Sequence, residues 1–115
     1  MAISEAYTGT ESVGVTEHYL TTDTTSISAI TTDGVFQLWL DVNDMVAADI
    51  LQIRIYEKCR TGDTQRIVAE WILRDAQSTP IWVSPSLILM NGWDMSLDCI
   101  AGTNITVLWS IRQVA

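Results

Sequence analysis

The sequence predicts one all-β domain, an antiparallel β-sandwich or jelly-roll-like fold of about eight short strands. Three observations predict it. Apolar and polar residues alternate every second position through most of 33–115, turn dipeptides recur at intervals of about ten residues, and no ten-residue stretch has helical periodicity. The 115 residues, 48% of them apolar and 17% charged, suit one domain with its own core.

The first 32 residues are rich in Thr and Ser and contain no Lys or Arg. Thr suits a pleated strand better than a helix. Residues 1–12 lack hydrophobic periodicity, so we predict an extended N-terminal arm over 1–12 and a sandwich domain over 13–115. Short strands are expected at 13–20 and 26–30.

Residues 35–42 form the first strongly alternating segment, with Phe36, Leu38 and Leu40 on one face and Trp39 on the other. A short turn is expected over 43–49. Residues 50–59 and 66–75 alternate again around a turn with Gly62, which predicts a β-hairpin.

Two prolines, Pro80 and Pro85, bracket 81–84 and predict an edge strand or a corner, because proline cannot donate to a ladder hydrogen bond. A short apolar strand is expected over 86–90, before the turn dipeptide Asn91-Gly92. Residues 93–99 and 105–111 then alternate around a turn at 101–104, with Trp93 on one face and Asp94 on the other.

The formal net charge is −8, and residues 1–53 contain acidic residues but no Lys or Arg. Such a chain repels phosphate backbones and anionic lipid surfaces, so neither nucleic acid nor a membrane is an expected partner. Residues 1–6 do not have the pattern of a signal peptide.

Motifs for chemistry are missing from the sequence. Cys59 and Cys99 are expected to be buried free thiols, although a cross-strand disulfide stays open. The one histidine, His18, is expected to be exposed on a strand, and one His with two distant Cys does not make a zinc site. Asp41, Asp44 and Asp49 do not have EF-hand spacing. We therefore predict a non-enzymatic protein with no catalytic, cofactor-binding or metal-binding residues.

Tryptophans are the most informative residues. Trp71, Trp93 and Trp109 share faces with aliphatic residues and are expected in the core. Trp39 lies on the second face of its strand and Trp82 on an edge, which is typical of residues that contact a partner protein. The candidate protein-interface residues are Ala2, Ile3, Tyr7, Trp39, Tyr56 and Trp82.

Residues 31–41 (TTDGVFQLWLD), residues 55–58 (IYEK) and the stretch from 82–85 (WVSP) to 109–114 (WSIRQV) resemble small structural proteins of tailed double-stranded DNA bacteriophages. The family that they resemble is the capsid decoration, or cement, proteins. The resemblance implies a structural virion protein on the outer surface of the capsid. It also implies a homotrimer that bridges major capsid protein subunits and has no cofactor. A carbohydrate- or receptor-binding module of a phage tail or fibre is the alternative, with Trp39, Trp82 or Tyr56 as a stacking platform.

Overall fold

The computed structural model describes residues 2–114, and this part of the chain contains nine strands and no helix. The predicted arm residue Met1 and the last residue, Ala115, lie outside the described residues. Sheet A contains β1 (Ile3–Val13), β9 (Ile105–Val114), β3 (Gly34–Asp41), β6 (Ile81–Val83) and β7 (Leu87–Leu89). Sheet B contains β2 (His18–Tyr19), β8 (Asp94–Ala101), β4 (Ile50–Glu57) and β5 (Arg66–Arg74).

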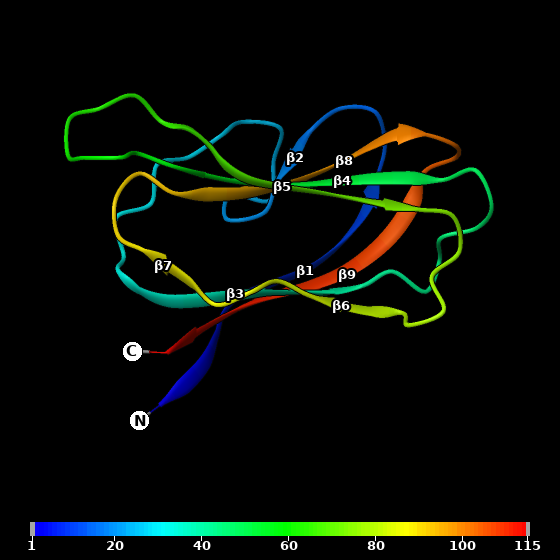
Figure 1. Ribbon diagram of the computed structural model, residues 1–115, viewed down its shortest axis with the longest axis horizontal. Helices are drawn as coiled ribbons and strands as arrows, with labels where there is room; N and C mark the ends of the chain where they lie inside the picture. Colours follow the sequence, from blue (N-terminus) through cyan, green and yellow to red (C-terminus); the bar gives the residue numbers. More distant parts are fainter. Residues whose placement is uncertain (1, 115) are drawn as a thin grey trace.

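The two sheets pack face to face as a sandwich (Figure 1). The strand order is β1-β9-β3-β6 in sheet A, with β7 beside β6 on the same strand β3, and β2-β8-β4-β5 in sheet B. All pairs are antiparallel. Every connection crosses between the sheets except the β4–β5 hairpin and the short β6–β7 link. The predicted all-β antiparallel sandwich is confirmed.

The core consists of the inward positions of both sheets, as the period-two pattern predicts. Leu38, Leu51 and Ile53 have no exposed surface. Trp93 is equally buried, and its ring lies 4.5 Å from that of Phe36 between centroids. Each buried aliphatic side chain of this kind contributes about 1.5–3 kcal/mol to stability.

One close approach in the core depends on glycine. Gly9 on β1 lies directly opposite Trp109 on β9. A Cβ atom added at Gly9 would lie 2.7 Å from Cζ2 of Trp109, closer than real Cβ contacts allow. The indole of Trp109 therefore fills the space that a side chain at position 9 would occupy.

The predicted arm is a strand of the sandwich over its described part. Residues 3–13 pair with β9 from Ile3 opposite Val114 to Val13 opposite Ile105, with one bulge between Glu5 and Tyr7. The apolar–polar alternation of this strand is not visible in the sequence, because two of its inward positions are not apolar side chains. They are Gly9, which makes room for Trp109, and the charged Glu11. The boundary predicted between residues 12 and 13 falls inside this strand.

The two strands predicted at 13–20 and 26–30 are mostly loop. Val13 is the last residue of β1, and after it only His18–Tyr19 is a strand, while Ile30 makes a single bridge to Trp93. Asp94 holds this crossover segment on the outside of sheet B. Its carboxylate accepts hydrogen bonds from the Thr21 hydroxyl at 2.7 Å and the Ser28 N–H at 2.8 Å.

Asp94 lies on the face opposite Trp93, as the alternation predicts, but it is fully buried. Burial raises its pKa, and the hydrogen bonds from Ser28, Thr21 and Met95 act in the opposite direction. Alternation assigns a face of the sheet correctly here. It does not reveal that a loop covers that face.

The cysteines are free, and the prediction that both are buried is half right. Cys99 is buried, whereas Cys59 is exposed because β4 ends at Glu57 and Cys59 lies in the following turn. The strand predicted between Pro80 and Pro85 is confirmed as β6 at one border of sheet A.

Candidate protein-binding face

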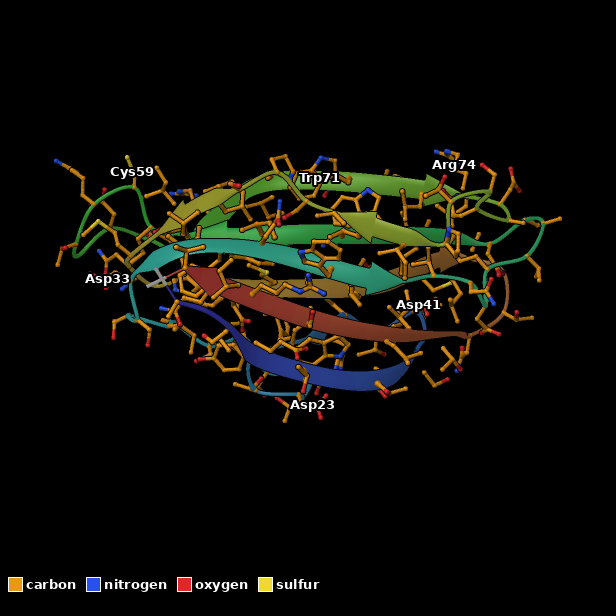
Figure 2. The ribbon with its side chains drawn as sticks, turned by 90° about the horizontal axis from the view of Figure 1, so that it is seen from below. Asp23, Asp33, Asp41, Cys59, Trp71 and Arg74 are labelled. Atoms are coloured by element: carbon orange, nitrogen blue, oxygen red, sulfur yellow. The ribbon has the colours of Figure 1, made fainter. Side chains whose placement is uncertain are left out.

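The outer face of sheet A has an aromatic residue at its centre. Trp39 points outward from β3 and lies between Ser110 on β9 and Val83 on β6, its direct neighbours in the register. It is on the outside because Leu38 and Leu40, the residues on either side of it, point into the core. Figure 2 looks onto this face, with Asp41 labelled at the end of β3.

Arg112 on β9 covers one side of the Trp39 ring. Its guanidinium carbon lies 3.6 Å from the ring centroid, a cation–π geometry. The indole Nε1 donates a hydrogen bond to the side-chain oxygen of Gln37 at 3.1 Å. The polar groups of this cluster are therefore oriented before any partner binds.

Exposed apolar side chains surround the Trp39 cluster. Two shallow hollows flank it, one bordered by Ile81 and Leu108, the other by Ile3 and Val35. Ile3 and Ile88 are the most exposed apolar residues on this face, at 69% and 81%. An exposed apolar patch with Trp and Arg at its centre is typical of a protein-interaction surface. We call this patch the sheet-A face: Ile3, Val35, Trp39, Ile81, Ile88, Leu108 and Arg112.

The chain ends extend the sheet-A face on its outer side. The start of β1 pairs with the end of β9, Ile3 opposite Val114. Figure 1 shows both ends leaving the sandwich beyond sheet A, away from sheet B. Ala2 is exposed beside Ile3.

The six predicted interface residues separate into three places. Ile3 and Trp39 lie on the sheet-A face, with Ala2 next to them. Tyr7 points inward, edge-on to Trp93 with centroids 6.1 Å apart. Tyr7 packs inside because the bulge before it turns its side chain to the core side, the side of its register partner Ile111.

Trp82 also points into the sandwich, opposite Leu40, and its ring lies 5.2 Å from that of Trp71 on β5. These two indoles fill the space between the border strands β5 of sheet B and β6 of sheet A. The edge position of Trp82 was predicted, but its direction was not, because the register of a three-residue strand is set by pairing with β3.

Sequence reasoning missed most of the aliphatic part of the sheet-A face, and Arg112. Val35 could have been found, since it shares the alternation of Trp39. Arg112 could not, because its stacking on Trp39 requires β9 to lie beside β3 in this register, with Arg112 opposite Gln37.

The outer face of sheet B, where Tyr56 lies, is a polar network instead. The carboxylate of Glu17 accepts hydrogen bonds from the hydroxyls of Tyr19 at 2.9 Å, Tyr56 at 2.5 Å and Ser96. Arg54 lies 3.6 Å from the same carboxylate. This network ties the β1–β2 loop to strands β4 and β8.

The electrostatics of the network favour an ionised Glu17. Burial acts to raise its pKa, but the hydrogen bonds from Ser96, Tyr56 and Tyr19 and the charge of Arg54 together lower it. Burial and the Glu17 carboxylate raise the pKa of both tyrosine hydroxyls. The tyrosines therefore act as hydrogen-bond donors and not as bases.

His18 is buried, so the expected exposed histidine is wrong. Its Nδ1 lies 2.9 Å from Glu11 and its Nε2 lies 2.8 Å from Asp23. Both ring nitrogens of His18 are therefore within hydrogen-bond distance of a carboxylate oxygen. These three residues are the one group of metal-ligand type among residues 2–114. Because each ring nitrogen faces a different carboxylate, Glu11 and Asp23 hold the imidazole ring from two sides.

No family model matches the chain, and no curated protein matches it either. Among residues 2–114, no helix is long and apolar enough to cross a membrane.

Proposed function

We propose that this protein is a structural virion protein, a capsid decoration protein that binds the exterior of a phage head. In this proposal the sheet-A face is the attachment surface, and it bridges neighbouring major capsid protein subunits. The observation that carries the proposal is the apolar sheet-A face, with Trp39 and Arg112 already arranged at its centre.

The strand order supports a jelly-roll description of the sandwich. Four-stranded paths β1-β9-β3-β6 and β2-β8-β4-β5, with most connections crossing between sheets, are what two Greek keys produce. Viral capsid domains and lectins both use this architecture, so the fold agrees with a virion role without selecting it.

The chain ends support a clamping role. The paired ends of β1 and β9 project on the same side as Trp39 and continue the apolar surface through Ile3. On a shell they would lie across a subunit boundary. A protein that binds only the assembled shell stabilises it by mass action. The net charge of −8 suits an exterior position exposed to water.

The arrangement of the aromatic residues favours a protein partner over a sugar. Arg112 covers one side of the Trp39 ring, and Trp82 is packed against Trp71. The hydroxyl of Tyr56 is bonded to Glu17. A sugar-stacking platform needs an open ring face, and these contacts already occupy one side of Trp39 and pack Trp82 against Trp71.

The test is co-sedimentation with heads of the encoding phage that have been depleted of this protein. Saturable binding in a fixed ratio to the major capsid protein is expected, together with a higher temperature of head disruption. Trp39→Ala should weaken binding roughly thirtyfold. Val68→Ser, an exposed change on β5 of the other sheet, should leave binding unchanged. Wild-type protein that fails to bind heads, or that binds tails instead, would contradict the proposal.

The homotrimer implied by the resemblance remains a separate prediction. It concerns the protein bound to heads, and it is measured there by the position of the protein relative to three-fold axes.

A further inference from the structure

Strand β5 forms an open lateral border of sheet B. It pairs with β4 on one side, and no strand among residues 2–114 pairs with its other side. Figure 2 shows β5 along one border of the molecule, with Trp71 and Arg74 labelled on it. Val68 is an extra residue in the ladder, because Ala69 pairs with Ile55 and Ile67 with Tyr56. The regular part of the open border is therefore 69–74.

The hydrogen-bond pattern shows which groups of this border are free. Asp75 donates its N–H to the carbonyl oxygen of Asp49 at 2.8 Å. These two residues are directly opposite when the β4–β5 register is extended by one pair. Hydrogen-bonded and non-hydrogen-bonded pairs alternate along an antiparallel ladder. Leu73 and Trp71 therefore bond to β4, and the residues between and beside them do not.

The backbone N–H and C=O groups of Glu70, Ile72 and Arg74 consequently point to the open border. In agreement, the Arg74 carbonyl accepts its hydrogen bond from the side chain of Gln77 and not from β4. Their side chains lie on the outer surface of sheet B, and Ile72 is 41% exposed. Such an unpaired strand is a template for another strand.

The order acid, apolar, base along these three positions is self-complementary. In an antiparallel pair centred on Ile72, Glu70 lies opposite the partner's Arg74 and Arg74 opposite the partner's Glu70. The two Ile72 side chains meet at the centre. A register shifted to centre on Glu70 would place the two glutamates opposite each other and Arg66 opposite the partner's Arg74. Opposite charges across strands stabilise a pair and like charges destabilise it.

We propose that two copies of this protein associate through β5, in antiparallel register about a two-fold axis at Ile72. Sheet B of each copy then continues into the other, and residues 70, 72 and 74 exchange backbone hydrogen bonds across the axis. In the pair, the Arg74 carbonyl exchanges its hydrogen bond from the Gln77 side chain for one from the partner's Glu70 N–H. Within each copy Glu70 also bonds Arg54 at 2.8 Å, so it lies between two arginines. The other long border strand, β1, carries Thr8, Thr10 and Ser12 on its outer surface and has no such charge pattern.

The pairing leaves the sheet-A face free, so it is independent of the proposed attachment to a shell. Native mass measured by light scattering over a concentration series tests it. The wild-type protein is expected to reach the mass of two copies. Glu70→Arg and Arg74→Glu should each raise the dissociation constant about tenfold or more, because each places like charges opposite each other twice.

The double variant E70R/R74E should restore the two-copy mass, since it exchanges the charges without changing the register. Arg66→Glu is the matched control, because Arg66 has no partner in this register. Circular dichroism and the unfolding temperature of each variant separate a lost contact from a lost fold, which matters because Glu70 also contacts Arg54.

A backbone variant provides a second, independent test. Ile72→Pro removes an N–H that points to the open border and makes no bond to β4, so the folded monomer should remain while the pair is lost. A wild-type monomer at every concentration, a trimer, or a dimer unaffected by Glu70→Arg and Arg74→Glu would each overturn the proposal. Head binding of the monomeric variants is measured separately and tests only the sheet-A face.

Discussion

The two outer faces of the sandwich differ in how their side chains are satisfied. On sheet B, the carboxylate of Glu17 collects hydroxyl hydrogen bonds from Tyr19, Tyr56 and Ser96, and a loop covers much of the face. On sheet A, aliphatic side chains around Trp39 are exposed. Both faces belong to strands with the same alternation, so strand pattern alone does not separate them.

The difference teaches where binding energy is available. A polar network that is complete within the chain stabilises the fold and offers a partner little, since its donors are already used. An exposed apolar face gains free energy only when something covers it. Substitutions in the Glu17 network should therefore reduce stability, and substitutions on the sheet-A face should reduce binding.

The largest expected effect is on the network of sheet B. Glu17→Ala removes the acceptor of three hydroxyls and a partner of Arg54, and we expect a loss of about 3 kcal/mol in the free energy of unfolding. Urea unfolding followed by tryptophan fluorescence measures it. A loss no larger than that of an exposed control such as Thr22→Ala would show that the network contributes little.

Trp39→Ala is the counterpart on sheet A. We expect it to weaken binding to its protein partner by about 2 kcal/mol, or roughly thirtyfold, as for a central interface tryptophan. The unfolding free energy should fall by only about 1 kcal/mol, from the lost contact with Arg112. A loss of unfolding free energy larger than the loss of binding free energy would contradict this assignment of Trp39 to a binding surface.

Strand β1 allows a comparison between an inward and an outward position of the same sheet. Gly9→Ala adds a Cβ against Trp109 on the inner side and should cost about 2 kcal/mol of stability. Thr8→Ala, one residue away on the outer side, is the matched control and should be nearly neutral. Thermal unfolding of both variants measures the difference, and equal values would mean that β9 shifts to accommodate the extra methyl group.

Glu17 also predicts a direction for acid unfolding. Its pKa in the folded protein is below its ordinary value of 4.5. Its ionised form therefore stabilises the protein above pH 4.5, and this contribution is lost as the pH falls through the lowered pKa. Unfolding free energies measured from pH 7 downward should show a flatter acid limb in Glu17→Gln. Parallel curves would contradict the prediction.

The smallest effect is expected at Asp98, the exception within sheet B. Burial raises its pKa, and its Oδ1 is buried without a hydrogen-bond partner. A raised pKa means that the folded protein is penalised when Asp98 is ionised, so Asp98→Asn should gain about 0.5 kcal/mol at pH 7. The gain should shrink as the pH falls through the raised pKa, and a variant that loses stability at pH 7 would refute this reading.

Much of the fold was predictable because burial on a strand has a simple period. Phe36, Leu38 and Leu40 on β3, and Leu51, Ile53 and Ile55 on β4, are buried as the alternation predicts. The 1–12 segment was misread because the glycine at position 9 belongs with a tryptophan one hundred residues later. No local window contains that pair.

The candidate site was predicted only in part, for a related reason. Trp39 was identified because it interrupts the polar side of an alternating strand. Tyr7 and Trp82 were named as interface residues but point inward, because a bulge and a three-residue strand leave the direction of a side chain to the neighbouring strand. The burial of His18 was missed because the two carboxylates that contact it come from other segments, Glu11 from β1 and Asp23 from a loop.

The sequence by itself determined the all-β class, the core faces of the long strands and the acidic charge, because these depend on composition and on local periodicity. Tertiary structure alone decided which outer face is polar and complete and which is apolar and open. That decision depends on strand order: β9 places Arg112 over Trp39, the β1–β2 loop and β2 bring Glu17 to Tyr56, and β5 is left at a border. Contacts between residues far apart in the chain follow from which strands pair, and strand pairing depends on the free energy of the whole sandwich.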